Sequence, residues 1–268
     1  MRINALLFLL SLPISWISAQ TASLPLQEKL KKPVYVVLDE EFGEDYNTLI
    51  QETMATYWVL SEYQFIETSE VPLLREDGNN LFLMLVKGEG IDADVREYKH
   101  VLTLAHYART GRYRNNITGV PLDLESTQDA RLTMIHGARL LQEKLRFELA
   151  KDAGEAEDLE SWLEARRDRL KESTLVLSRE FVDMESSELP AVYSGKVDWV
   201  SSKEFEALLQ APQPGVAYAM VHGYKIPGGY VIEKSIVESL SGELLYFATA
   251  GSPNAQGKFS KKDFKALE

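Results

Sequence analysis

The sequence contains no cysteine, and this absence excludes several kinds of protein. A disulfide framework, a thiolate metal site, a cysteine nucleophile and a lipid-modified cysteine all require that residue. The chain therefore depends on an apolar core for its stability. With 268 residues, of which 45% are hydrophobic, it is long enough to bury one.

Basic residues are scarce relative to acidic ones. The chain has 29 Lys and Arg against 41 Asp and Glu, a formal net charge of -12. Such a charge repels the phosphate backbone of nucleic acids and anionic lipid surfaces. We therefore expect no nucleic-acid partner.

Familiar catalytic and metal-binding motifs are also missing. The sequence has no GxSxG elbow, no Walker loop, no GxGxxG and no HExxH. His100 and His106 share one predicted strand but lie about 20 Å apart along it, too far to share a metal. The acidic residues Asp92, Asp94 and Glu97 lack the glycine and closing glutamate of a calcium loop, so we interpret them as a solvated connection. No metal site and no cofactor are predicted.

A long apolar run occurs only at the N-terminus. Arg2 precedes an apolar stretch from Ala5 to Ile17, and small residues follow it. This order is typical of a secretory signal peptide, and the run is shorter than the ~20 residues that span a bilayer. We predict a signal peptide over residues 1–19, cleaved after Ala19, with Ala22 as the alternative site. An uncleaved signal anchor is the other interpretation.

These features predict an exported protein, periplasmic or extracellular, with no membrane span after cleavage. The lack of cysteine favours a bacterial source, since eukaryotic secreted domains more often carry disulfides. Residues 20–32 then form an N-terminal tail.

The pattern of residues 33–125 predicts a first α/β unit. A helix is expected over Glu44 to Leu60, and a short helical turn over Ser69 to Leu74 with Ser69 as its cap. The expected strands are Val34 to Leu38, Tyr63 to Ile66, Leu81 to Val86, Lys99 to Tyr107 and a segment from Arg112 onward.

Residues 172–250 repeat this order of elements. "TLVLSREF" (Thr174 to Phe181) aligns with "YVVLDEEF" (Tyr35 to Phe42), and "VAYAMV" (Val216 to Val221) aligns with "LFLMLV" (Leu81 to Val86). We predict an α/β (α+β) fold of two tandem small mixed-sheet units that arose by internal duplication. Residues 126–171 are rich in helix formers and predict a helical hairpin, Asp129 to Ala150 and Ala156 to Lys171, between the units. Residues 251–268 form a C-terminal tail.

Three carboxylates, beginning at Asp39 and ending at Glu41, follow the first strand. We favour capping of the next helix by Asp39, or by Ser178 in the second unit, because acids at a helix start stabilise it. The alternative is a catalytic site of Asp39, Glu41 and His222, the last of which follows a strand and is expected to be exposed.

Two other segments supply candidate ligand-binding residues. One is a basic and aromatic patch after the fourth strand, and the other is the loop His222 to Tyr230, "HGYKIPGGY". We favour an exposed hairpin face for the first and a turn for the second. The candidates are Arg109, Arg112, Tyr113, Arg114, Tyr224 and Tyr230.

The sequence thus favours a non-catalytic binding or assembly module of the bacterial envelope over an enzyme. Its ligand surface is expected at the strand ends or between the units, and its candidate partners are an envelope protein or a glycan. The alternative is a hydrolase-like enzyme that acts on an envelope polymer.

Overall fold

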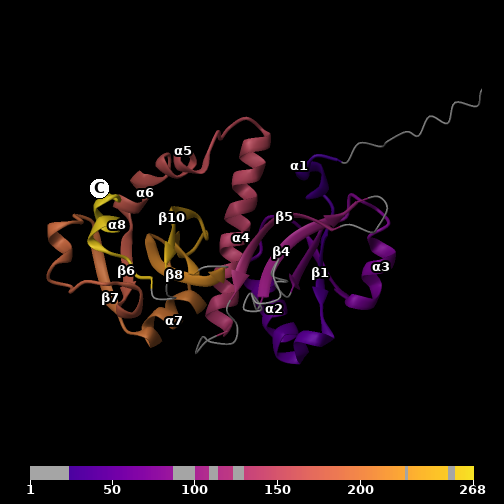
Figure 1. Ribbon diagram of the computed structural model, residues 1–268, viewed down its shortest axis with the longest axis horizontal. Coiled ribbons are helices and arrows are strands. Elements are labelled where there is room, and N and C mark those ends of the chain that lie inside the picture. Colours follow the sequence, from indigo (N-terminus) through magenta and orange to yellow (C-terminus); the bar gives the residue numbers. More distant parts are fainter. Residues whose placement is uncertain (1–23, 87–99, 109–113, 123–129, 227–228, 253–256) are drawn as a thin grey trace, which may run out of the picture.

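The computed structural model describes residues 24–86, 100–108, 114–122, 130–226, 229–252 and 257–268. The predicted signal peptide lies outside them. The described chain forms two five-stranded mixed sheets with helices (Figure 1), which confirms the predicted α/β fold of two tandem sheet units.

The first sheet has the strand order β2-β1-β3-β4-β5. β1 runs parallel to its neighbours β2 and β3, and β4 runs antiparallel to its neighbours β3 and β5. The strands are β1 (Val34–Leu38), β2 (Tyr63–Glu67), β3 (Phe82–Val86), β4 (His100–Tyr107) and β5 (Arg114–Leu122).

The helices of the first unit are α1 (Leu26–Lys29), η1 (Glu40–Phe42), α2 (Gly43–Tyr57), η2 (Thr68–Glu70) and α3 (Val71–Leu74). Two helical segments lie where the sequence predicts them, α2 and the turn formed by η2 and α3, whereas α1 lies in the predicted N-terminal tail and η1 is not predicted. Gly43 has φ 83° and lets the chain pass from η1 into α2. The prediction of Ser69 as a cap is wrong, because Glu67 and Glu70 form the capping box of η2.

The second sheet has the order β7-β6-β8-β9-β10, the same order and strand directions as the first. Its strands are β6 (Thr174–Ser178), β7 (Lys196–Val200), β8 (Val216–Ile226), β9 (Gly229–Glu238) and β10 (Leu244–Ser252). Its helices are η3 (Arg179–Phe181), η4 (Leu189–Ala191), α7 (Ser202–Gln210) and α8 (Lys261–Lys265). The shared order agrees with a duplication, which stays a prediction.

The connector consists of α4 (Ala130–Asp152), α5 (Leu159–Glu164) and α6 (Arg167–Glu172). Its second arm is thus two short helices rather than one. Asp158 caps α5 by accepting a hydrogen bond from the amide of Ser161 at 2.8 Å.

Helix α4 lies between the two sheets (Figure 1), and we call the sheet face turned toward it the inner face. One apolar cluster runs from Val36 and Leu102 in the first sheet, through Leu141 of α4, to Tyr218 in the second. Each outer face has a smaller cluster of its own, in which α3 covers the first sheet and α8 covers the second. The two sheets are therefore joined by a shared core rather than by a linker.

Candidate functional site

The carboxylates after β1 act as a helix cap. One carboxylate oxygen of Asp39 accepts a hydrogen bond from the amide of Glu41 at 2.9 Å, and the Asp39 amide donates to Asn47 Oδ1 at 3.0 Å. Asp39 is thus a cap, as predicted, but of the short 3-10 helix η1; α2 has Phe42 at its N-cap position, which makes no side-chain cap hydrogen bond. The same role predicted for Ser178 is wrong, because its hydroxyl donates to Glu180 Oε1 at 3.1 Å and makes no cap hydrogen bond.

His222 does not lie in a loop. Strand β8 continues past it to Ile226, and β9 begins at Gly229, so the predicted loop is the end of a long hairpin. The side chain of His222 is buried and stands directly opposite Glu233 of β9. His222 thus belongs to the second sheet, whereas Asp39 belongs to the first.

The other predicted binding residues are not gathered into one site. Arg114 is exposed at the start of β5, and its guanidinium lies 3.7 Å from Met84 Sδ. Tyr230 is half-buried in β9. Arg109, Arg112, Tyr113 and the side chain of Tyr224 lie outside the described residues.

A buried polar cluster joins α4 to the inner face of the second sheet. His136 Nδ1 lies 3.3 Å from the Tyr218 hydroxyl, and Nε2 lies 3.2 Å from Ser235 Oγ. Ser235 in turn donates to the carbonyl of Met220 at 3.4 Å. This pattern suits a neutral imidazole in which Nε2–H donates to Ser235 and Nδ1 accepts from Tyr218.

The environment of His136 keeps it uncharged. Burial, together with the nearby basic groups of His222, Arg139 and Lys144, lowers its pKa to about 3. A Ser–His pair is the arrangement of a nucleophile and its base. Ser235 is only 2% exposed and His136 only 3%, so a substrate does not reach them. The cluster therefore anchors α4 to the sheet.

Arg139 and Lys144 extend this contact across both units. The guanidinium of Arg139 lies 4.7 Å from the ring centroid of Tyr57 on α2 and 5.8 Å from that of Tyr218 on β8. Lys144 donates to the carbonyl of Gly119 on β5 at 3.3 Å and lies 3.8 Å from the carboxylate of Glu233 on β9. α4 is thus held by polar contacts to each sheet unit.

A second buried network begins at Glu143, which is 1% exposed. Its carboxylate accepts from Arg146, from Arg166 at 3.0 Å and from the amide of Leu244 at 3.1 Å. Arg166 also pairs with Glu243 at 2.8 Å. These contacts place the start of β10 beside α5 and α6.

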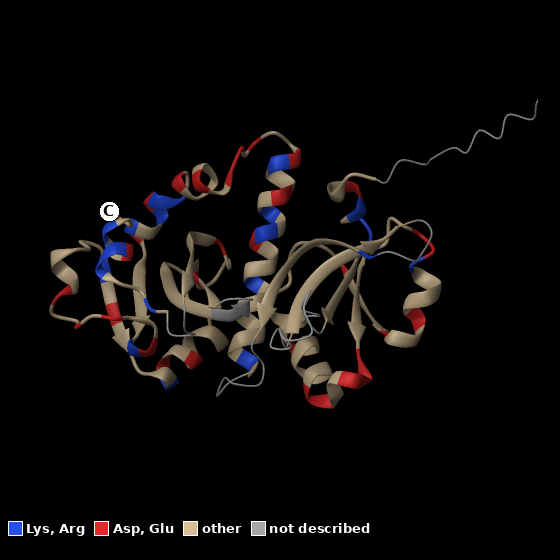
Figure 2. Ribbon diagram, viewed as in Figure 1, with Lys and Arg blue, Asp and Glu red and all other residues tan. Residues whose placement is uncertain are grey.

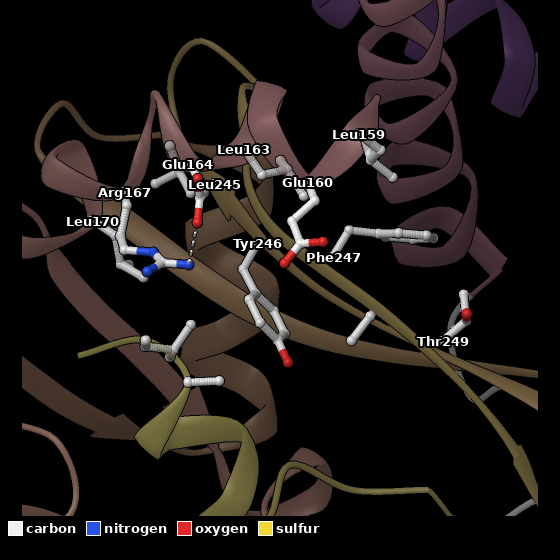
Figure 3. Close-up of a pocket in the computed structure, with 13 residues that line it drawn as sticks. Leu159, Glu160, Leu163, Glu164, Arg167, Leu170, Leu245, Tyr246, Phe247 and Thr249 are labelled. Carbon is white, nitrogen blue, oxygen red and sulfur yellow. Dashed lines mark ion pairs between the residues drawn. The ribbon is translucent and has the colours of Figure 1, made fainter. Parts of the chain in front are cut away.

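A cavity of about 440 Å³ lies between α5, α6, β10 and the end of α8 (Figure 3). We call it the β10 groove. Its volume falls within the ~300–1,000 Å³ typical of ligand pockets. The residues that define it include Glu160, Glu164, Arg167, Leu245 to Thr249, Ala266 and Leu267.

The groove has one acidic wall. Glu164 pairs with Arg167 at 3.9 Å, and Glu160 directs its carboxylate toward the floor (Figure 3). On the floor, burial and the carboxylate of Asp263 raise the pKa of Tyr246 to about 12, so its phenol stays neutral. Within the described ranges, no group of three or more His, Cys, Asp or Glu side chains is placed to hold a metal.

Sequence reasoning missed both the groove and the buried cluster. The groove combines residues near 160, 247 and 266, and no local motif connects segments so far apart. One sequence signal was available: β10 contains no charged residue and no proline, which is unusual for a strand at a sheet edge.

Comparison with protein-family models, with curated proteins and with solved structures finds no match to this chain. Among the helices that the structure describes, none has the length and apolar character needed to cross a bilayer.

Proposed function

We propose that this chain is a non-catalytic binding or assembly module of the bacterial envelope and that the β10 groove is its ligand site. The observation that carries the proposal is a groove of about 440 Å³ set against an uncharged edge strand. Export is supported by the signal-peptide pattern of residues 1–19. A partner protein or glycan of the envelope then supplies the ligand.

The chemistry of the groove suits binding better than catalysis. Its carboxylates lie on an exposed helix, one of them paired with Arg167, and its phenol is held neutral. A general acid or base has a pKa near the working pH and lies within hydrogen-bond reach of the reacting group. The floor and the wall of α8 are largely apolar, as in a recognition surface.

The alternative is a hydrolase that uses Asp39, Glu41 and His222, and it remains a hypothesis. Asp39 is engaged in a helix cap in the first sheet, while His222 is buried in the second. No observation in the described part of the chain favours it over the groove.

The proposal is tested by obstructing the groove. Ala266 is exposed and lines the groove, so Ala266→Trp fills part of it without disturbing the core. We expect this variant to lose the partners that the wild-type protein captures from the envelope extract of its source organism, identified by mass spectrometry. Ala211→Trp is the matched control, because Ala211 is exposed at the end of α7 and does not line the groove. Equal capture by all three proteins would contradict the proposal.

A further inference from the structure

β10 differs from the three other strands at sheet edges. β5 carries Arg114 and Pro121, β7 carries Lys196 and Asp198, and β2 ends at Glu67. Charged residues and proline at an edge discourage another strand from pairing there. β10 has nine residues, none of them charged and none of them proline, and its bulge lies at the start, between Leu244 and Tyr246. Among the described edge strands it is the one without a charged residue or a proline.

The hydrogen-bond register shows which backbone groups of β10 point away from the sheet. The amide of Glu238 donates to the carbonyl of Glu243, so Glu238 directs its backbone groups toward β10. Backbone groups alternate in direction along an antiparallel strand, so every second residue of β9 does the same. Ser235 and Glu233 belong to the other set, which bonds to β8. Their β10 partners are Phe247 and Thr249.

Phe247 and Thr249 therefore direct their N–H and C=O groups away from β9 and into the groove. No hydrogen bond joins the backbone of residues 245–249 to any described element other than β9. These unpaired donors and acceptors form a template for a further strand.

The groove follows the edge of the sheet rather than one of its faces. Its floor consists of five consecutive residues, Leu245 to Thr249. Because side chains alternate between the two faces of a sheet, a pocket on one face would contact only every second residue. A strand laid in the groove would thus lie in the plane of the second sheet.

The charge of the α5 wall indicates what kind of strand fits. Between Asp152 and Ala165 the chain has six acidic residues and no basic one, and α5 is marked by acidic segments in Figure 2. Glu160 of this wall has no ion-pair partner among the described residues. The opposite wall, at Ala266 and Leu267, is apolar. Walls on both sides admit a single strand but not the helix-flanked edge of a second copy.

We propose that the β10 groove binds an extended segment of a partner protein, which adds to β10 as a sixth strand of the second sheet and presents a Lys or Arg side chain to Glu160. This inference rests on the proposed function and specifies its ligand. Main-chain hydrogen bonds to Phe247 and Thr249 supply the attachment, and the side-chain contacts supply the selectivity.

The test uses a displayed library of random peptides of about nine residues, selected on the immobilised protein. We expect the enriched peptides to be rich in β-branched and aromatic residues and to carry Lys or Arg. Thr249→Pro removes an outward N–H without breaking the β9 ladder, and an edge strand tolerates proline in that position. The affinity of this variant for the enriched peptides, measured by fluorescence anisotropy, should be at least about tenfold lower than that of the wild type. A tenfold change corresponds to ~1.4 kcal/mol of binding free energy.

Two controls separate backbone pairing from other effects. Thr249→Val keeps the N–H and should bind as the wild type does. Glu160→Lys should weaken binding, whereas Glu157→Lys makes the same charge change outside the groove and should not. If Thr249→Pro fails to fold, the test is made on the wild-type protein by amide hydrogen exchange, with and without bound peptide. Bound peptide should then slow exchange at Phe247 and Thr249.

The outcomes distinguish this inference from the proposed function. Enriched peptides that bind Thr249→Pro as tightly as wild type, or that leave exchange at Phe247 and Thr249 unchanged, overturn strand addition. Strand addition is also overturned if no peptide is enriched and the wild-type protein instead binds a small molecule or glycan that Ala266→Trp does not bind. The groove would then still be the ligand site. If native partners bind Ala266→Trp as well as they bind the wild type, the proposed function itself is overturned.

Discussion

The two units have the same strand order but present opposite faces to α4. In the first unit, the segment that connects β1 to β2 contains α2 and covers the inner face, while α3 covers the outer face. In the second unit, the segment that connects β6 to β7 contains η4 and covers the outer face, while α7 covers the inner face. The second sheet is thus turned over relative to the first.

Hydrogen bonds identify the equivalent residues. The amide of Tyr35 donates to Leu81 beside β3, and the amide of Thr174 donates to Gly215 beside β8. The residues that follow them are Val36, in the shared core, and Leu175, in the outer cluster. Equivalent positions therefore point in opposite directions. Crossovers between parallel strands are almost always right-handed, so the strand order determines on which side of its own sheet each crossover lies. The first crossover faces α4 in the first unit and faces away from α4 in the second unit, so the second sheet must be turned over.

The contacts of α4 differ accordingly. Gly137 lets α4 approach β5 closely, since a Cβ there would overlap Leu122. The contact with the second sheet is made by His136, Tyr218 and Ser235. The comparison teaches that a repeated topology does not determine which face becomes the interior. That choice depends on the helix packed between the units.

The largest expected effect concerns α7 and α3, which occupy the same place in the chain order. Phe205 of α7 is 1% exposed and packs its ring near Phe181 and Tyr218. Phe205→Ala should lower the free energy of unfolding by about 3–5 kcal/mol. Val71→Ala on α3 should cost about 1.6 kcal/mol, from two methyl groups at ~0.8 kcal/mol each. Urea denaturation of both variants checks this, and equal losses would contradict the assignment of α7 to the shared core.

The next effect compares the buried network around Glu143 of α4 with the exposed ion pair between α4 and α2. Glu143→Gln should lower the free energy of unfolding by about 3 kcal/mol, because it leaves a buried network without its anion. Glu52→Gln breaks the exposed pair of Arg131 with α2 and should cost at most about 1 kcal/mol. Thermal unfolding monitored by circular dichroism measures both. A larger loss for Glu52→Gln would reverse the comparison.

The pH dependence of stability should differ between His136 and His106. The folded protein holds His136 neutral down to about pH 3, whereas the unfolded chain protonates near its ordinary pKa of 6.5. The unfolded state therefore binds more protons between these values, and stability falls as pH falls. The slope is at most about 1.4 kcal/mol per pH unit, or ~2 kcal/mol between pH 6.5 and 5.

His136→Gln should remove most of that slope. Burial and the charge of Lys29 also lower the pKa of His106, but this side chain is only half-buried, so His106→Gln should remove less of the slope. Denaturation midpoints of the three proteins at several pH values give the comparison. An unchanged slope in His136→Gln would show that another group controls it.

The smallest effect compares the equivalent residues Asp39 and Ser178. Asp39→Ala removes a cap and should cost about 1 kcal/mol, whereas Ser178→Ala should cost less than about 0.5 kcal/mol because no cap is lost. The double variant Asp39→Ala, Glu41→Ala should lose helix stability yet bind its partner normally. Loss of binding with unchanged melting would count against the proposed binding module.

Local patterns in the sequence predicted most of the elements. Continuous apolar runs predict β1 and β3, because both faces of each strand are buried, and apolar residues spaced three and four apart predict α2 and α4. The segment His222 to Tyr230 is predicted to be a loop because of its glycines, whereas the structure continues β8 to Ile226 and begins β9 at Gly229. The capping role was assigned to Asp39 correctly and to Ser178 incorrectly, because the hydroxyl of Ser178 has Glu180 as a competing partner.

Local sequence patterns are enough to predict the α/β class, the two units and the strand-to-helix junction at Asp39, because these depend on neighbouring residues. Long-range packing, by contrast, selects which face of each sheet is interior, buries Arg139 and His136, and places a groove beside β10. These features arise from segments about 80 to 100 residues apart, such as His136 with Tyr218 and Ser235. Their contacts depend on how the units pack about α4, which no local pattern records.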